Sequence, residues 1–548
     1  MSDKSFNLVH EPWIRVVTNS CEEREVSLSE LFAHAHEYRR LAGETPAYDA
    51  TMTRMLLAIV ETVFYRYTAD GSSELITPDT HTAKDVLDRW NAYYKQGKFG
   101  TTFQTYLEQY SGRFWLFHPN VPFYQVHDLQ YGTRYQIKSV VGTLKESNNK
   151  ATKHLFSMTE GTNLEQLEPA EAARCLLFYN GFCANVKQDK KPGVPGSPDP
   201  VSIGRMGALG FIMAEGSTLF DTLMLNLCAL RDGEFVWGSP KPSWEEPVCD
   251  LQARLIEMPD NLPQAYTMLS RRMYWHKSKD SDSVIALQAL GGDYYPLAND
   301  TTEQMTLWKT AKLDDSKDAV LYPKRHSAGY HLWREFSNLV ASEIRIPGLI
   351  LWLSQLCDNG LVPQDTILSI RSVGMDYADS MRYVFGDCFS DSMALSLGLL
   401  GKMGEPGKQV VCEEVQKCAQ VREEIRIFAW KVTKILYGED RAPEFLTERL
   451  TASFYSTVDT SFRQWLLSFC GDFDPEEKKM EWEKTVYRLA ADMADSYVES
   501  LGNAVFRMKN TKKTGKAHPE SILEVLNWYK KGLRDIYPKD VKKEEDDE

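Results

Sequence analysis

Two stretches of the chain hold residue types that could do chemistry, but neither has the spacing that its chemistry needs. Residues 401–409, GKMGEPGKQ, hold glycines before a lysine, as a phosphate-binding loop does. That segment is one residue too long and has no Ser or Thr after the lysine. His34, His36 and Glu37 lie together in HAHEY, where alternate positions of a predicted helix face different sides. They are therefore not expected to hold one metal ion.

Other patterns of catalytic centres are missing as well. His326 and His331 lie near an amphipathic segment without an HExxH arrangement or paired carboxylates, and the chain has no GxSxG turn. We therefore predict a protein that is not an enzyme and that needs no cofactor and no metal. The alternative is a divergent metal-dependent nuclease or hydrolase, with a site assembled from isolated His and Asp residues that sequence spacing cannot reveal.

The composition is typical of a folded protein of two or three domains. Its 548 residues are 43% hydrophobic and 26% charged. We find no signal peptide and no run of ~20 apolar residues, which predicts a cytoplasmic protein without membrane contact. Ten scattered cysteines without a CxxC pair predict reduced thiols. Because the formal net charge is −14, any contact with DNA must be local.

The first 400 residues mix strand and helix patterns. Alternation in FNLVHEPWIRVV predicts a strand, and SLSELFAHAHEYRRL predicts a helix that begins with a capping box. Two apolar stretches, 265–276 and 283–290, flank a polar KSKDSD and predict a β-hairpin. Further helices are predicted by apolar periodicity within residues 45–67, 83–115, 169–186, 216–230, 331–340 and 349–358.

Apolar periodicity predicts helices throughout the C-terminal quarter of the chain. Four long periodic stretches are separated by Gly, Pro or Asn, and they cover residues 409–437, 443–470, 475–505 and 520–535. Short connections between long helices favour a bundle. The predicted fold class is therefore α+β, with a large mixed N-terminal domain (1–404), a C-terminal four-helix bundle (405–540) and an acidic disordered tail (541–548).

Several phrases in this order resemble the CasA family, the large subunit of type I-E CRISPR Cascade surveillance complexes. They are FNLVHEPWIRV, SLSELFAHAHEYRRLAGETPAYDATMTRMLLAIV and AYTMLSRRMYWH. The resemblance implies a non-catalytic subunit that recognises a short motif (PAM) beside a double-stranded DNA target and helps to open the duplex for R-loop formation. The implied partners are the CRISPR RNA-containing backbone, small and RNA-end-binding subunits, and a helicase-nuclease recruited for antiviral defence.

The first site that the resemblance implies is a glycine-rich loop that enters the minor groove. Its counterpart here is 193–200, GVPGSPDP, with Gly193, Gly196 and Ser197 as motif-binding candidates. The prolines depart from the family pattern, because proline lacks the amide hydrogen that a base acceptor would use. A plain surface turn is the alternative. Four flanking cations are candidates for phosphate binding, namely Lys187, Lys190, Lys191 and Arg205.

The second implied site is a lysine at the hairpin tip. Lys279, or failing it Lys277, is the candidate within HKSKDSDS, and a soluble turn is the alternative. Arg271 and Arg272 match the SRR phrase of the family, although on a strand they could equally brace an internal carboxylate.

The third implied site is a wedge inserted beneath the motif. GMDYADSMRY (374–383) resembles that segment, with Tyr377, Ala378, Asp379 and Ser380 on the wedge. An acidic residue stands where the family has a glutamine-like wedge, so Tyr377 is the group expected to stack. A turn at the start of a helix, with Asp as its cap, is the alternative.

The fourth implied site is a loop that senses the RNA end of the complex. ATKHLFSMTEG (151–161) resembles it, with Phe156 as the stacking residue and Lys153 near phosphate. A buried Phe in an ordinary loop is the alternative.

Overall fold

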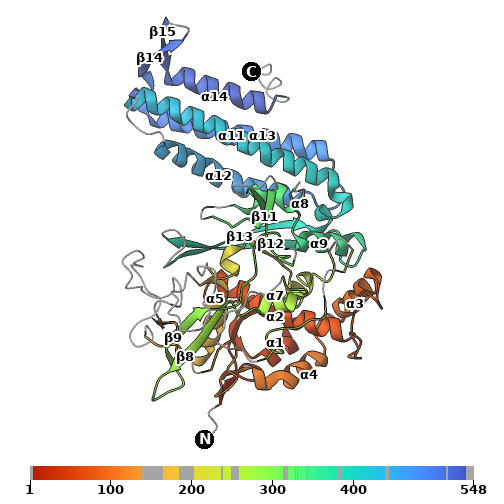
Figure 1. Cartoon of the computed structure of the whole chain (residues 1–548). Coiled ribbons are helices and arrows are strands. Elements are labelled where there is room, and N and C mark those ends of the chain that lie inside the picture. The colour runs from red at the N-terminus through yellow and green to blue at the C-terminus, as the bar shows by residue number, and fades with distance from the viewer. Residues whose placement is uncertain are drawn as a thin grey trace. The chain divides into compact units, whose positions relative to one another are not determined.

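The computed structural model (Figure 1) describes most of the chain and divides it into two compact units. The first unit comprises Met1–Tyr330, Ser342–Leu361 and Leu368–Ser392, and the second comprises His331–Ala341, Val362–Ile367 and Met393–Glu548. The described residues are 4–127, 129–137, 140, 165–183, 203–231, 233–235, 238–247, 258–300, 302–312, 319–327, 329, 331–341, 344–378, 384–438, 444–513 and 516–538.

The N-terminal residues build a small antiparallel sheet with the order β3-β2-β4. The elements are β1 (Ser5–Asn7), β2 (Ile14–Thr18), β3 (Glu23–Val26), α1 (Leu28–His34) and β4 (Tyr38–Leu41). The Ser27 side chain caps α1 as the sequence predicts, accepting from the Glu30 amide at 3.1 Å. The helix predicted for EYRRL is wrong, because Tyr38–Leu41 form β4, which pairs with β2.

The long helix α2 (Pro46–Arg66) is the core of the first unit. Every residue from Ala47 to Tyr65 is buried. A helix that is apolar on most sides must be covered on most sides. The helices α4 (Thr101–Tyr110), α5 (Pro169–Phe182), α6 (Leu219–Leu225) and α7 (Leu262–Thr267) all contact it.

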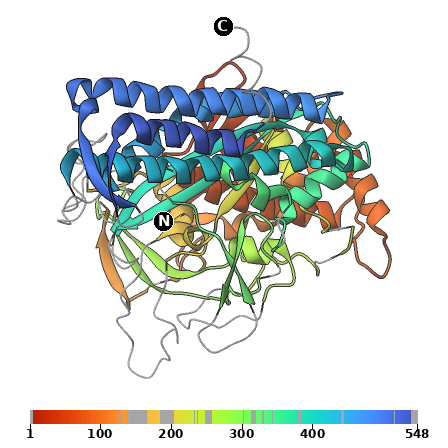
Figure 2. The same cartoon turned by 90° about the horizontal axis from the view of Figure 1, so that it is seen from above.

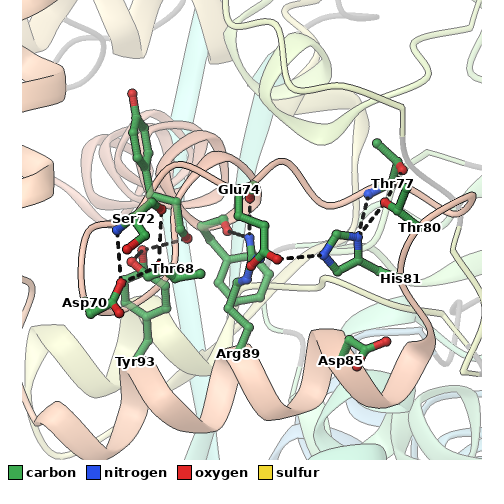
Figure 3. Close-up of polar contacts among 12 residues, drawn as sticks. Thr68, Asp70, Ser72, Glu74, Thr77, Thr80, His81, Asp85, Arg89 and Tyr93 are labelled. Carbon is green, nitrogen blue, oxygen red and sulfur yellow. Dashed lines mark hydrogen bonds and ion pairs between the residues drawn. The ribbon is translucent and has the colours of Figure 1, made fainter.

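Short-range polar contacts fasten the connection between α2 and α3 (Ala83–Gln96), as Figure 3 shows. Asp70 accepts hydrogen bonds from the Thr68 hydroxyl at 2.5 Å and from the Ser72 amide at 3.0 Å. Glu74 pairs with the buried Arg89 at 2.5 Å. Each of these links joins residues no more than 15 positions apart in the sequence.

The other strands of the first unit form short antiparallel sheets. The predicted hairpin is confirmed as β8 (Arg271–Lys277) and β9 (Val284–Gly291), although residues 262–267 before it are helical. A second, longer hairpin, β12 (Ile367–Ala378) and β13 (Val384–Ser396), was not predicted, and β7 (Phe211–Glu215) pairs with it. The remaining elements are β5 (Trp115–Phe117), β6 (Thr133–Gln136), β10 (Trp308–Lys312), β11 (Ala319–Pro323) and α9 (Gly348–Asp358).

The second unit is built on the four predicted C-terminal helices. They are α11 (Glu405–Tyr437), α12 (Glu444–Leu467), α13 (Pro475–Ser500) and α14 (Ile522–Ile536), and the blue and cyan helices run side by side in Figure 2. Trp465 stacks on Trp482 with ring centroids 4.8 Å apart in their core. The unpredicted hairpin β14 (Met508–Lys513) and β15 (Lys516–Ser521) separates α13 from α14.

Short elements that precede residue 405 in the sequence also pack against these helices. The short helices α8 (Phe336–Val340) and α10 (Leu397–Leu400) contact α11. The Trp333 ring stacks on Phe462 at 4.5 Å, and the Leu397 amide donates to the Thr366 carbonyl at 2.9 Å. The second unit therefore starts earlier than residue 405, where the sequence placed the domain boundary.

Candidate nucleic-acid interface

The C-terminal end of α5 closes the base of the segment that carries the predicted glycine-rich loop. α5 ends at Phe182, and residues 184–202 lie outside the described part. The Gly204 amide donates to the Cys183 carbonyl at 2.8 Å, so the two ends of the segment meet. Burial raises the pKa of the Cys183 thiol, although Arg271 opposes the shift. Cys183 and Gly204, which flank the segment, are therefore buried and hydrogen-bonded to each other.

The end of β12 meets the same point. The Tyr377 hydroxyl donates to the Phe182 carbonyl at 2.8 Å, and burial raises the pKa of that tyrosine. A Cβ atom at Gly207 would lie 1.9 Å from the Tyr377 hydroxyl oxygen. Only glycine at 207 therefore lets residues 206–208 pack against this ring.

The start of β8 is the third segment held there. The Asn180 side chain donates to the Met268 carbonyl at 3.0 Å and accepts from the Arg271 amide at 3.3 Å. The Ser270 hydroxyl donates to the Asn180 carbonyl at 2.6 Å. We call the set Asn180–Cys183, Gly204–Gly207, Ser270–Arg271 and Tyr377 the α5 junction.

The tip of the β8–β9 hairpin lies at the other end of α5. The Leu167 and Val284 backbones exchange two hydrogen bonds of 2.9 Å, just before α5 begins. The Ser283 hydroxyl donates to Glu168 at 3.1 Å. Because α5 has 14 residues, the tip is about 20 Å from the α5 junction.

The predicted lysines of the tip have different surroundings. Lys277 pairs with Asp282, and its ammonium lies 4.5 Å from the centre of the Phe117 ring. Lys279 is exposed. Of the two, Lys279 is therefore the side chain more available to an external phosphate.

Two other predicted site residues lie inside the protein. Tyr377 is only 6% exposed, so its ring has no free face for a base in this conformation. The Arg205 guanidinium pairs with Asp300 and lies 3.8 Å from the centre of the Tyr295 ring. Both residues stabilise the α5 junction from within, and their DNA-contacting roles stay predictions.

Ala378 is the last residue of β12, so the described part of the wedge segment, residues 374–378, is strand. The other wedge residues, the glycine-rich loop, its lysines and the RNA-end loop lie outside the described residues, namely Asp379, Ser380, Gly193, Gly196, Ser197, Lys187, Lys190, Lys191, Lys153 and Phe156.

Arg325 is a residue at the α5 junction that the sequence did not single out. Its guanidinium lies 5.2 Å from the centre of the Tyr377 ring and donates to the Met375 carbonyl at 3.3 Å. It brings positive charge to the C-terminal end of β12. No motif marks it, because its neighbours in space are 50 residues away in sequence.

The histidines considered for chemistry have structural partners. His326 Nε2 lies 3.0 Å from the Phe211 carbonyl oxygen, and His331 Nδ1 lies 3.1 Å from Asp459. His34 Nδ1 lies 3.3 Å from Glu37 at the surface. Within the ranges that the structure describes, no three His, Cys, Asp or Glu side chains are grouped to hold a metal ion.

Comparison with known proteins identifies the family. The family model described as CRISPR-associated protein Cse1 matches residues 7–493, which is most of the chain. The chain belongs to the Cse1 family. This confirms the resemblance to CasA on which the site predictions were based.

One curated relative and several solved Cse1 structures are similar to the chain. CasA/Cse1 of Thermus thermophilus is 28% identical over 341 residues, an alignment that covers 62% of the chain and 60% of the relative. The chain thus matches less than two thirds of that relative's length.

Similarity in structure extends further along the chain. Cse1 of Thermobifida fusca has a TM-score of 0.80 at 24% identity and covers 98% of both chains. Cse1 of Acidimicrobium ferrooxidans has a TM-score of 0.75 at 19% identity, with 97% of this chain and 98% of the other covered. A chain of a CRISPR RNA-guided surveillance complex has a TM-score of 0.71 at 15% identity, with 97% and 99% covered. These matches confirm the α+β fold.

The described helices of this Cse1 family member include none with the length and apolarity required to span a bilayer.

Proposed function

We propose that the chain is the large, non-catalytic subunit of a cytoplasmic Cascade complex. In this role it reads a short motif beside a double-stranded DNA target, opens the duplex for R-loop formation and recruits a helicase-nuclease. Family membership supports the assembly role, and a related chain is part of a CRISPR RNA-guided surveillance complex. The partners are the CRISPR RNA, the other Cascade subunits, the DNA target and the nuclease.

One observation supports the DNA-reading role: two candidate elements are held at the same place, the C-terminal end of α5. The Gly204 amide closes the 184–202 segment at Cys183, and Tyr377 of the β12–β13 hairpin bonds to the neighbouring Phe182. A loop and a wedge that leave one rigid point can enter adjacent base steps together. Unstacking one base step costs a few kcal/mol. A rigidly supported wedge helps the protein to supply this free energy.

The separation of the hairpin tip gives Lys279 a different task. At about 3.4 Å per base step, the ~20 Å from the α5 junction to the tip is about six steps. Lys279 therefore serves to hold a backbone phosphate, which positions the duplex without reading its sequence.

The test uses the complex assembled with its guide RNA and the other subunits. Binding to a guide-matched duplex is measured with a library of flanking sequences. Replacing Gly196 and Ser197 by bulky acidic residues is expected to abolish the preference for one flanking motif. Lys279→Ala is expected to weaken binding to all flanks about equally, whereas Lys95→Ala, an exposed lysine on α3, leaves binding unchanged.

Unchanged motif preference in the Gly196 and Ser197 variant would contradict the loop assignment. A metal-dependent cleavage activity of the isolated chain, abolished by a chelator, would favour the alternative nuclease or hydrolase.

A further inference from the structure

A run of positive charge lies near the end of this acidic chain. Residues 500–519 contain five Lys and Arg and no Asp or Glu, in a protein of net charge −14. The run follows residue 493, where the match to the Cse1 family model ends. What it does is therefore not supplied by the family model.

The backbone places most of these charges on the β14–β15 hairpin. Lys513 pairs with Lys516 across the two strands, and Lys512 pairs with Ala517. In the sequence, residues 509–521 include no aliphatic residue larger than Ala and Pro. A lone two-stranded hairpin is only marginally stable in water. Lysines on free strand edges do block unwanted pairing, but a bound polyanion would in addition stabilise the hairpin.

Exposed aromatic side chains lie beside the root of the hairpin. Phe506 is 72% exposed, and Tyr437 at the end of α11 is 57% exposed. Arg507 donates to the Leu436 carbonyl at 3.1 Å, which holds the root of the hairpin against the end of α11. Exposed apolar side chains that lie next to one another on a protein surface mark interaction sites.

The exposed rings continue along α11 together with cations. Trp430 is 41% exposed and lies seven residues before Tyr437, so the two rings share a face about 10 Å apart. The Lys434 ammonium lies 3.9 Å from the centre of the Trp430 ring, between them along the helix. Lys431, whose ion pair with Glu520 measures 3.3 Å, connects this face to the end of β15.

We propose that the β14–β15 hairpin and the α11 face of Trp430, Lys434 and Tyr437 bind single-stranded nucleic acid. Lysines alternating with exposed rings suit a single strand, because its phosphates meet the cations and its unpaired bases stack on the rings. A duplex hides its base faces, so it would use the charges but not the rings. Ring spacing of about 10 Å corresponds to about three nucleotides at ~3.4 Å each. The proposed site rests on the proposed function only in taking nucleic acid as its ligand.

The test measures fluorescence anisotropy of labelled 20-nucleotide oligo(dT) and oligo(U) with the full chain alone, at several salt concentrations. The variant carries Lys512→Ala, Lys513→Ala and Lys516→Ala. Its Kd is expected to rise about tenfold, and its salt slope to fall by about two, since each phosphate contact on a single strand contributes about 0.7. The control removes the same charge from exposed positions of the first unit, namely Lys84, Lys95 and Lys98.

Ring removal separates stacking from charge. The pair Tyr437→Ala and Phe506→Ala is expected to weaken single-strand binding about fivefold or more, with the salt slope unchanged and binding to a 20-base-pair duplex unaffected. Equal losses in the hairpin variant and the lysine control, equal losses for single strand and duplex in the ring variant, or no single-strand binding by the wild type would each overturn the proposal. Preference for oligo(dT) or oligo(U) assigns DNA or RNA.

Motif preference of the assembled complex is measured in parallel on the hairpin variant. It is expected to persist, so failure of this site and failure of the motif-reading function give different results.

Discussion

The C-terminal helices and the α5 junction hold their parts together in opposite ways. The buried residues of α11 recur every three or four positions, so they form one apolar face that packs against the neighbouring helices. They include Val411, Val415, Cys418, Val421 and Ile425. At the α5 junction, Tyr377 bonds to a residue 195 positions away, and Ser270 to one 90 positions away. The packing of the C-terminal helices is thus specified by residues close together in the sequence. The α5 junction forms only when distant segments meet in the folded chain.

This difference suggests where each region is vulnerable. The helical unit depends on bulky apolar contacts, which tolerate loss of any single polar group. The α5 junction depends on a few hydrogen bonds and on close packing at one glycine. Truncating a large buried side chain should therefore lower the stability of the helical unit strongly. At the α5 junction, the loss or gain of a single small group should already lower stability.

The largest effect is expected for Trp482→Ala in the core of the helical unit. Trp482 is 1% exposed and packs against Trp465 and Phe462. Truncation should lower the free energy of unfolding by about 3–5 kcal/mol through lost burial and a cavity. Chemical denaturation followed by circular dichroism measures this loss. Phe445→Ala, at a residue that is 74% exposed on α12, should change stability by less than about 0.5 kcal/mol.

A smaller, pH-dependent effect is expected at Glu414 on α11. Burial raises the pKa of Glu414 to about 7, against the attraction of Lys417 and Lys479, and Glu483 adds repulsion. Below the unfolded pKa the carboxyl is protonated in both states. As pH rises from about 4.5 to 7, only the unfolded state ionises freely, so stability falls by about 2–3 kcal/mol.

Denaturation midpoints between pH 4.5 and 7.5 measure this trend. Glu414→Gln should flatten the profile, whereas Glu413→Gln, whose carboxylate is 55% exposed, should leave it as in the wild type. An equal slope in Glu414→Gln and the wild type would refute the assignment.

The smallest effect is expected at the α5 junction and tests its close packing. Gly207→Ala should cost about 1–3 kcal/mol, because the new Cβ would meet the Tyr377 hydroxyl oxygen. Tyr377→Phe removes that oxygen and should cost about 1 kcal/mol by itself. In the double variant the cost should be lower than the sum by about 0.5 kcal/mol or more.

Tyr65→Phe is the matched control for this cycle. Its buried hydroxyl also donates to a carbonyl, that of Ala229 at 2.9 Å, but it does not face Gly207. Combined with Gly207→Ala it should be additive. Coupling of the same size in both cycles would mean that Gly207 acts through general destabilisation and not through Tyr377.

The sequence by itself determined the family, the α+β class and most of the helices. Apolar periodicity predicted α2, α5 and the four C-terminal helices, because a helix is specified by neighbours three and four residues apart. The β8–β9 hairpin followed from two apolar runs around a polar turn. The segments resembling the family's DNA-contacting loops were also located by sequence alone, through the phrases that this chain shares with the family.

Only the tertiary structure decided which segments meet. Residues 38–41 have a helical pattern but form β4, because β2 offers them a strand partner. Arg205 carries the charge of a phosphate ligand but pairs internally with Asp300. Tyr377 resembles a stacking residue but is buried at the α5 junction. In each case the deciding partner lies about 20 to 200 residues away, and hydrogen bonds and ion pairs over that separation leave no periodic trace in the sequence.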